Sequence, residues 1–182
     1  MLIALATGCD LFDARDPEAP DGARGSWDVP RLPDEVLTNL SLALFERNAA
    51  NYMRSFAADS FQFIADPVVV QQQPDLAAWD YGREQTFINS LFGEGVLPRD
   101  SAVFAVFSAI ETTLLGDTAH VTARYELTAQ VAVAGAPGPM AGEGQFSLII
   151  GDQGYWEIYS WSDRRTEELA SWSDLKALLQ SR

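Results

Sequence analysis

Residues 121–131 read VTARYELTAQV, a stretch in which apolar and polar side chains alternate. An alternation with a period of two is typical of a β-strand that has one buried face and one wetter face. The same period runs from Ser101 onward, and turn-forming residues divide it at regular intervals, at Gly116-Asp117, at 135–139 and at 151–154. The pattern predicts four long strands in antiparallel succession.

Helical spacing replaces this alternation nearer the N-terminus. Asp34 can cap a helix whose apolar residues recur every three or four positions, namely Val36, Leu37, Leu40 and Leu44. A second, short helix is expected over 49–57, with Asn48 at the corner between the two. Asp80 can cap a third helix that stops at Gly93 and carries Phe87, Ile88, Leu91 and Phe92.

Three shorter segments complete the predicted elements. Residues 60–64 read SFQFI, and residues 68–70 are three consecutive valines. Aromatic and β-branched residues favour strands, so these two runs predict a short hairpin. Residues 173–179 predict a closing helix that Ser173 can cap.

The composition fits one folded domain and argues against nucleic acid as a partner. The chain has 182 residues, of which 47% are hydrophobic, enough for a sizeable core but too few for two ordinary domains. Its 26 acidic and 12 basic residues give a formal charge of −14. This charge repels phosphate backbones and anionic lipid surfaces, so we expect no nucleic-acid partner.

We also expect no metal site and no cofactor. The chain has one cysteine and one histidine, His120, and no HExxH spacing, so it cannot assemble a usual zinc site from its own side chains. The segment 93–95, Gly-Glu-Gly, is followed by Val-Leu-Pro, which cannot open a helix as a phosphate-binding loop must.

Cys9 ends a short apolar stretch, LIALATG at residues 2–8, in which small residues directly precede the thiol. The stretch resembles the lipobox of bacterial lipoprotein signal peptides, where the peptide is cut before the cysteine and the cysteine is acylated. A signal peptide begins with a basic region, so we expect the complete leader to start upstream of Met1. The resemblance implies a lipid anchor at Cys9 and a place in the bacterial cell envelope, on the periplasmic side or the cell surface.

The residues after Cys9 define the predicted domain organisation. Residues 10–33 are rich in Asp, Pro, Gly and Arg and have no apolar period, as expected of a disordered tether. Nothing later is long and apolar enough to span a bilayer, so the lipid is the expected membrane contact. We assign 1–9 to the end of the signal peptide, 10–33 to an acidic tether and 34–182 to one domain.

The order of helix, helix, short hairpin, helix and four long strands resembles the nuclear transport factor 2-like, or SnoaL-like, superfamily. Residues 51–61 resemble the family's second helix entering its first strand, and residues 156–163 resemble its last strand. The resemblance implies an α+β fold in which a strongly curved antiparallel sheet wraps three helices into a cone, followed here by a short C-terminal helix. More narrowly, the lipobox, the tether and the segments 79–85 and 171–176 resemble uncharacterised bacterial lipoproteins built on this fold.

The same resemblance implies where chemistry would occur. Enzymes of this fold that isomerise or dehydrate use a carboxylate base inside the cone, with Tyr, Asp or His donors, and such a base needs an apolar pocket that raises its pKa. The candidate catalytic residues are Glu126, Glu157, Asp163 and His120, with Asp80 and Glu84 at the third helix. Glu126 shares a strand face with Arg124 and His120, which favours a surface salt bridge for it, and Asp80 is readily explained as a helix cap.

Aromatic residues mark the expected ligand pocket. Those that would line or rim the cone are Trp79, Tyr81, Tyr125, Trp156, Tyr159 and Trp161. A concave apolar cavity with a few polar groups is where small molecules usually bind, although most aromatic side chains serve the core. Trp79 and Tyr81 precede the third helix and are the predicted mouth of the cone.

Three functions remain open from the sequence. The first is a membrane-tethered cell-envelope domain that binds a small apolar ligand or a partner protein. The second is a small lyase, isomerase or hydrolase that uses a carboxylate in the cone pocket. The third is a dimeric structural scaffold, in which two copies pair through the sheet face.

Overall fold

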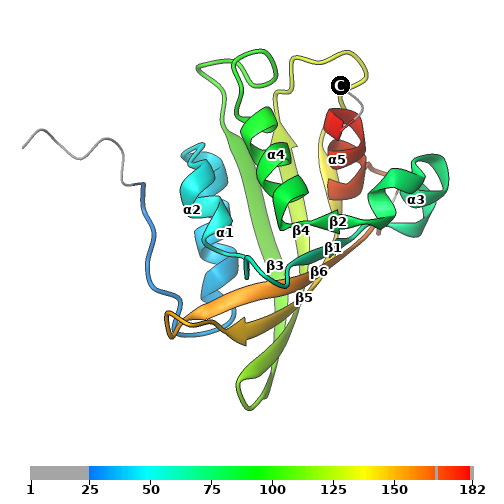
Figure 1. Ribbon diagram of the computed structural model, residues 1–182. Helices are drawn as coiled ribbons and strands as arrows, with labels where there is room; N and C mark the ends of the chain where they lie inside the picture. The colour runs from blue at the N-terminus through cyan, green and yellow to red at the C-terminus, as the bar shows by residue number, and fades with distance from the viewer. Residues whose placement is uncertain (1–24, 167, 181–182) are drawn as a thin grey trace, which may run out of the picture.

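The computed structural model describes residues 25–166 and 168–180, and Figure 1 shows their arrangement. In chain order the elements are α1 Glu35–Phe45, α2 Ala49–Met53, β1 Gln62–Ile64, α3 Pro67–Gln72, the 3₁₀ helix η1 Pro74–Ala77, β2 Trp79–Asp80, α4 Tyr81–Leu91, β3 Val103–Leu115, β4 Thr118–Ala129, β5 Met140–Ile150, β6 Trp156–Arg164 and α5 Trp172–Gln180.

All strands belong to one sheet with the order β2-β1-β6-β5-β4-β3. β3 to β6 pair antiparallel in chain order, which confirms the four long strands predicted from the alternation. β1 adds to β6 in parallel and carries β2 at its far side. The sheet curves around α1, α2, α4 and α5, so the predicted α+β architecture with a strongly curved sheet is confirmed (Figure 1).

The curvature has local causes in β3 and β5. The pairing of β3 with β4 shifts register between Ser108 and Glu111, where Ala109 adopts a positive φ of 47°. Such a bulge bends a strand and increases its twist. On β5, a Cβ at Gly144 would lie 2.6 Å from the ring of Phe146, so glycine is required where the large side chains of the concave face cross the strand.

The valine run at 68–70 forms part of a helix, so the predicted hairpin with residues 60–64 is wrong. The Asp66 side chain accepts the N–H of Val68 at 2.9 Å, and Pro67 occupies the first turn of α3. An N-cap followed by proline starts a helix strongly enough to override the β-propensity of three valines. β1 pairs instead with β2, with Phe63 opposite Trp79.

Of the three helix caps predicted from the sequence, at Asp34, Asp80 and Ser173, the one at Asp80 is confirmed, and Asn48, expected only as a corner, is a further cap. Asp80 accepts the N–H of Arg83 at 2.9 Å at the start of α4, and Asn48 accepts the N–H of Asn51 at 3.0 Å at the start of α2. Asp34 precedes α1 as expected, but it has a helical backbone and no side-chain cap hydrogen bond. Glu35 accepts the backbone N–H groups before this helix instead, which corrects the role predicted for Asp34.

Residues 25–33, which we call the N-terminal strap, lie on the domain although they fall within the predicted tether. The ring of Trp27 packs edge-on against Tyr155, with centroids 5.3 Å apart, and the guanidinium of Arg54 lies 5.2 Å from the Trp27 ring centroid. The N–H of Trp156 donates to the carbonyl of Pro30 at 3.2 Å. Cys9 and the tether up to residue 24 lie outside the described residues. Within those residues, no helix combines the length and apolarity that crossing a bilayer requires.

Candidate functional site

Glu84 and Lys176 form an ion pair in the core, and neither side chain is exposed to solvent. α4 turns Glu84 inward together with Phe87 and Ile88, and α5 brings Lys176 to it from the opposite side. The Glu84 carboxylate also accepts the Tyr52 hydroxyl and the Trp79 indole N–H, each at 2.7 Å. Buried charge is tolerated only when it is paired and hydrogen-bonded, and this carboxylate has three donors.

Four aromatic rings surround the Lys176 ammonium, and we call them the aromatic cage. Its Nζ lies 4.3 Å from the centroid of Phe87, 4.4 Å from that of Phe63, 4.8 Å from that of Trp79 and 5.5 Å from that of Trp161. A cation within about 6 Å of a ring centroid is attracted by the ring quadrupole. Burial lowers the pKa of Lys176 to about 8, and Glu84 opposes that shift.

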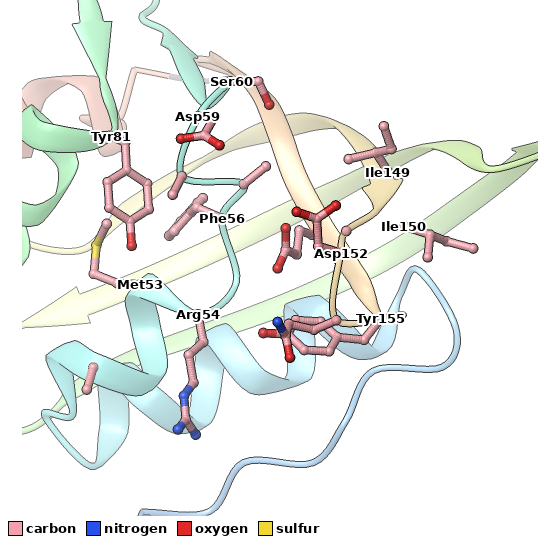
Figure 2. A pocket seen from close by; sticks show the side chains of 16 residues that line it. Met53, Arg54, Phe56, Asp59, Ser60, Tyr81, Ile149, Ile150, Asp152 and Tyr155 are labelled. Carbon is pink, nitrogen blue, oxygen red and sulfur yellow. The ribbon is translucent and has the colours of Figure 1, made fainter.

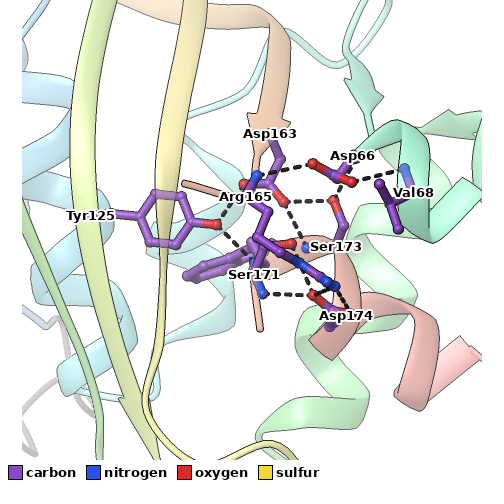
Figure 3. A network of polar contacts seen from close by, with 9 residues as sticks. Asp66, Val68, Tyr125, Asp163, Arg165, Ser171, Ser173 and Asp174 are labelled. Atoms are coloured by element: carbon purple, nitrogen blue, oxygen red, sulfur yellow. Dashed lines mark hydrogen bonds and ion pairs between the residues drawn. The ribbon is translucent and has the colours of Figure 1, made fainter. Parts of the chain in front are cut away.

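A second buried carboxylate, Asp163 on β6, fastens α5 to the sheet (Figure 3). Its Oδ1 accepts the Tyr125 hydroxyl at 2.5 Å, and its Oδ2 accepts the N–H and the hydroxyl of Ser173 at 2.8 and 2.5 Å. Burial raises the pKa of Asp163, and these donors oppose the shift. The Tyr125 hydroxyl accepts the N–H of Trp172 at 2.9 Å, and burial raises its pKa too.

The Asp174 side chain caps the start of α5 by accepting from Ser171, which corrects the predicted cap at Ser173. The N–H of Ser171 donates to Asp174 Oδ2 at 2.6 Å, and Asp174 also holds the Arg165 guanidinium at 2.7 and 2.8 Å. Ser173 lies inside the helix, where its hydroxyl accepts the N–H of Asp66 at 2.9 Å while donating to Asp163. The same network therefore ties α5 to both β6 and the start of α3 (Figure 3).

α5 fills the interior of the cone, by which we mean the core around Tyr125, Phe146 and Trp161. The Trp172 ring lies 5.1 Å from that of Trp161 and 6.3 Å from that of Tyr125. The carboxylates of this interior, Glu84 and Asp163, are thus enclosed and hydrogen-bonded. In this arrangement neither can touch a substrate.

The remaining residues selected from the sequence separate into two groups. Trp79, Tyr125, Trp156 and Trp161 are buried in the core, and Tyr159 is half-buried on β6. His120 and Glu126 are exposed on the outer face of β4, where His120 Nδ1 lies 3.1 Å from Ser147 Oγ. The structure therefore does not bring His120 or Glu126 to the cone.

An open pocket of about 470 Å³ lies beside the turn between β5 and β6 (Figure 2). It is formed by the end of α2, the loop 57–60, Tyr81 at the start of α4, the turn 149–155 between β5 and β6, and Glu157. Tyr81 points into it from one side, and Asp152 faces it from the turn (Figure 2). Tyr81 and Glu157 are the two residues selected from the sequence that line it.

Glu157 is the half-buried carboxylate of this open pocket. Burial raises its pKa, the nearby Asp152 raises it further, and a hydrogen bond with Tyr155 opposes both. Burial likewise raises the pKa of Tyr81, with a smaller contribution from the negative Glu157. A Cβ at Gly151 would come too close to the Glu157 carboxylate, so glycine leaves the space that this side chain occupies.

The charges of the open pocket are mainly negative. Asp59, Asp152 and Glu157 line it, against one cation, Arg54. The Arg54 guanidinium lies over the ring of Trp27 in the N-terminal strap. The pocket also has an apolar part, to which Met53, Phe56, Ile149 and Ile150 contribute. This combination suits an organic molecule that carries both a cation and an apolar group.

One local feature of the sequence predicts this pocket, although hydrophobic periodicity does not reveal it. Two glycines and Asp152 form the turn directly before Tyr155 and Glu157, so a sharp reversal places two carboxylates beside an aromatic residue. Among the residues that the structure describes, no group of three or more His, Cys, Asp or Glu side chains is arranged to hold a metal ion.

Known proteins resemble this chain in structure, but none was found to match it in sequence. No protein-family model matches the chain, and no curated protein matches it either. Solved structures do resemble it. A putative scytalone dehydratase from Novosphingobium aromaticivorans superposes with a TM-score of 0.60 at 12% identity, over 76% of this chain and 88% of that one.

Two further structures show the same likeness. An NTF2-like protein from Cytophaga hutchinsonii gives a TM-score of 0.54 at 13% identity, over 72% of this chain and 93% of that one. LinA superposes with a TM-score of 0.56 at 9% sequence identity, over 74% of this chain and 83% of the LinA chain. The chain therefore has the nuclear transport factor 2-like fold, as the resemblance implied, and identities this low show the fold alone.

Proposed function

We propose that this chain is a binding domain that holds a small organic cation in the open pocket. The observation that carries the proposal is the position of Glu157, a half-buried carboxylate with a raised pKa that lines an open cavity beside Asp152. A bound cation would relieve the repulsion between these two carboxylates. It would gain more from Glu157 than from a fully solvated carboxylate, because partial burial reduces the screening by water.

The proposal changes the ligand predicted from the sequence in one respect. An apolar ligand was expected inside the cone, but α5 occupies that space with Trp172 and Lys176. In the open pocket, Met53 and Phe56 provide contacts for an apolar group, while Asp152 and Glu157 provide the charge. The ligand class we propose is therefore amphipathic and cationic.

A titration followed by nuclear magnetic resonance tests this proposal with benzylammonium, benzyl alcohol and benzoate, which share a ring and differ in charge. We expect benzylammonium to shift the amide signals of the turn 149–155 and of the loop 57–60, and to bind more tightly than the other two. Glu157→Gln should weaken benzylammonium binding by about tenfold, the effect of roughly 1.4 kcal/mol. Equal binding of benzoate, or shifts confined to other surfaces, would contradict the proposal.

Glu126→Gln is the matched control for this experiment. It makes the same chemical change on the outer face of β4, where Glu126 is exposed, and should leave binding unchanged. Gly151→Ala adds an independent test, because its methyl group would displace the Glu157 carboxylate without removing the charge. We expect it to weaken binding as Glu157→Gln does, while the fold is retained because a flexible side chain can move aside.

An enzymatic role would have to use the same residue. Of the predicted catalytic carboxylates, Asp163 is enclosed and Glu126 is exposed, whereas Glu157 faces a cavity large enough for a small substrate. A lyase, isomerase or hydrolase would therefore use Glu157 as its acid or base. Conversion of a bound molecule that Glu157→Gln abolishes, with binding retained, would favour this role over binding alone.

We further propose that acylated Cys9 holds the domain at a membrane of the bacterial cell envelope. The support is the apolar stretch that ends at Cys9 and the acidic segment that follows it. Mass spectrometry of the protein made from a gene with its complete leader should find Cys9 diacylated or triacylated at the mature N-terminus. Cys9→Ser should abolish the modification, and an unmodified Cys9 would contradict the anchor.

Pairing of two copies through the sheet is the third proposal. Phe104 and Val106 on the edge strand β3 are more than half exposed, at 51% and 59%, and Phe45 of α1 lies beside Phe104. Exposed apolar side chains of this size commonly mark contact surfaces. Light scattering after size-exclusion chromatography should then give the mass of a dimer, and Val106→Glu should give a monomer. A monomeric wild-type protein would remove the proposal.

A further inference from the structure

We propose that the aromatic cage together with Glu84 is a binding site for a primary alkylammonium group, which in this structure is occupied by Lys176 of the same chain. The site is separate from the open pocket, and neither depends on the other. Its occupant comes from α5, whereas its walls come from other elements of the fold.

The walls come from four elements other than α5, and Trp172 of α5, which packs against Phe87 and Trp161, stays in place when only the Lys176 side chain is removed. Phe63 lies on β1, Trp79 on β2, Phe87 on α4 and Trp161 on β6. The rings support one another, because Phe63 packs against Trp79 at 6.1 Å and against Trp161 at 5.3 Å between centroids. Enclosure by four aromatic rings favours an ammonium ion over a neutral group.

The carboxylate of the site is also oriented without the lysine. Tyr52 donates to Glu84 Oε1 and Trp79 donates to Glu84 Oε2, both at 2.7 Å. These two hydrogen bonds leave the carboxylate aimed at the place where Nζ of Lys176 lies. Without Lys176 the site would hold a buried carboxylate that has no counterion. Binding a cation from solution would then be favourable, because it would pair this buried charge.

A groove between α4 and α5 is the route by which an ammonium ion from solution would reach the aromatic cage. Its cavity of about 280 Å³ is lined by Trp79 and Phe87, two of the cage residues, and by Arg83, Thr86, Ser90, Leu179 and Gln180. A small alkylammonium ion that reached this groove would therefore lie against the outer side of the cage. The Lys176 ammonium lies 4.8 Å from the Trp79 ring centroid and 4.3 Å from that of Phe87, the two rings that the groove and the cage share.

Lys176→Ala with added propylammonium chloride is the test, because propylammonium reproduces the part of the lysine side chain beyond Cβ. We expect the variant to bind propylammonium with a dissociation constant of about 1 mM, a reasonable value for so few atoms. Calorimetry should detect the binding, and the melting temperature of the variant should rise with ligand concentration. Glu157→Gln alone, in which Lys176 still fills the cage and the open pocket has lost its carboxylate, should show neither effect, and any binding to wild-type protein that Glu157→Gln removes belongs to the open pocket.

Three controls separate this site from general salt or solvent effects. Potassium chloride at equal ionic strength and 1-propanol, which lacks the charge, should leave the variant unchanged. The double variant Glu84→Gln with Lys176→Ala should bind propylammonium at least about tenfold more weakly, because the carboxylate charge is gone. Glu157→Gln in the Lys176→Ala background should bind it normally, which distinguishes this site from the open pocket.

The outcomes are decisive even if the variant folds poorly. If Lys176→Ala is unfolded alone, propylammonium in the refolding buffer should restore its near-ultraviolet circular dichroism, while potassium chloride should not. A folded variant that does not bind propylammonium would overturn the inference. An unfolded variant that propylammonium does not refold would overturn it too. Equal binding of propylammonium and 1-propanol would also overturn it, because the cavity would then be merely apolar.

Discussion

Glu84 and Lys176 are 92 residues apart in the sequence, yet their side chains form a fully buried ion pair that joins α4 to α5. The pair replaces what would otherwise be apolar packing between two helices. A buried pair contributes little net stability over an apolar pair of the same shape, but each partner is costly to leave alone. Removing one partner should therefore cost much more stability than replacing both, and this difference can be measured in variants.

Lys176→Met should lower the free energy of unfolding by about 3–5 kcal/mol, because it leaves the Glu84 charge buried without a cation. Glu84→Gln should cost a similar amount through the unpaired ammonium. Urea denaturation of both single variants and the double variant measures the coupling between the two sites. We expect the double variant to lose clearly less than the sum, and strict additivity would show that the pair does not interact as described.

The pKa of Lys176 predicts a rise of stability at alkaline pH. The folded-state pKa is about 8 and the ordinary value is 10.5, so between these values the unfolded chain binds more protons than the folded chain. The free energy of unfolding should therefore increase as pH rises through this window, by up to about 1.4 kcal/mol per pH unit, and the gain is lost as pH falls through 8.

Urea denaturation at pH 7, 8, 9 and 9.5 checks this slope, with Lys176→Met as the control for the remaining charges. The series stops below pH 10 because burial raises the pKa of Tyr52 and Tyr125 above that value, which makes stability fall at higher pH. If Lys176→Met shows the same slope as the wild-type protein, the rise does not come from Lys176.

Two serines of α5 should differ in their effect on stability. Ser173→Ala removes a hydroxyl that donates to buried Asp163 and accepts the N–H of Asp66, so we expect a loss of about 2–3 kcal/mol. Ser171→Ala removes a hydroxyl that donates to Asp174 at 3.1 Å and also contributes, as a weaker partner than Ser173, to the hydrogen bonding of Asp163, with an expected loss of about 1 kcal/mol. Thermal or urea denaturation shows which variant loses more stability. A larger loss for Ser171→Ala would contradict the prediction that the Ser173 hydroxyl is the more important of the two.

Ligand binding in the open pocket should weaken as pH falls. The pKa of Glu157 lies above its ordinary value of 4.5, so this carboxylate loses its charge at a higher pH than a solvated one. The affinity for benzylammonium should therefore begin to decrease at a higher pH than it would for a solvated carboxylate, since a neutral Glu157 no longer attracts the cation. Glu157→Gln should flatten the profile, and a flat wild-type profile would argue against a role for this residue.

The four long strands and the cap of α4 could be predicted from the sequence because their causes are local. The alternation in residues 121–131 depends only on which side chains face the core, and Asp80 caps α4 through a residue three positions away. The valines of α3 show the limit of propensity. Asp66 and Pro67 precede them, and together these two residues determine the backbone direction more strongly than the valines do.

The ion pair could not be predicted as a pair, because its partners lie on elements that meet only in the folded chain. Each partner nevertheless left a trace in its own helix. Glu84 precedes Phe87 by three positions and Ile88 by four, which puts it on the buried face of α4. Lys176 stands four positions after Trp172 on α5 in the same way. A charged residue in phase with an apolar stripe is evidence for a buried partner elsewhere.

The N-terminal strap determines where a mechanical load would enter the domain. Tension applied from that end would first reach the hydrogen bonds of Gly25 to Asn51 and of Ser26 to Glu46, which are 3.2 and 2.9 Å long. The next contact is the ring of Trp27, which supports Tyr155 and Arg54 at the rim of the open pocket. A pull on the chain would thus deform the rim before it strained the sheet, and the open pocket would be the force-sensitive part of the molecule.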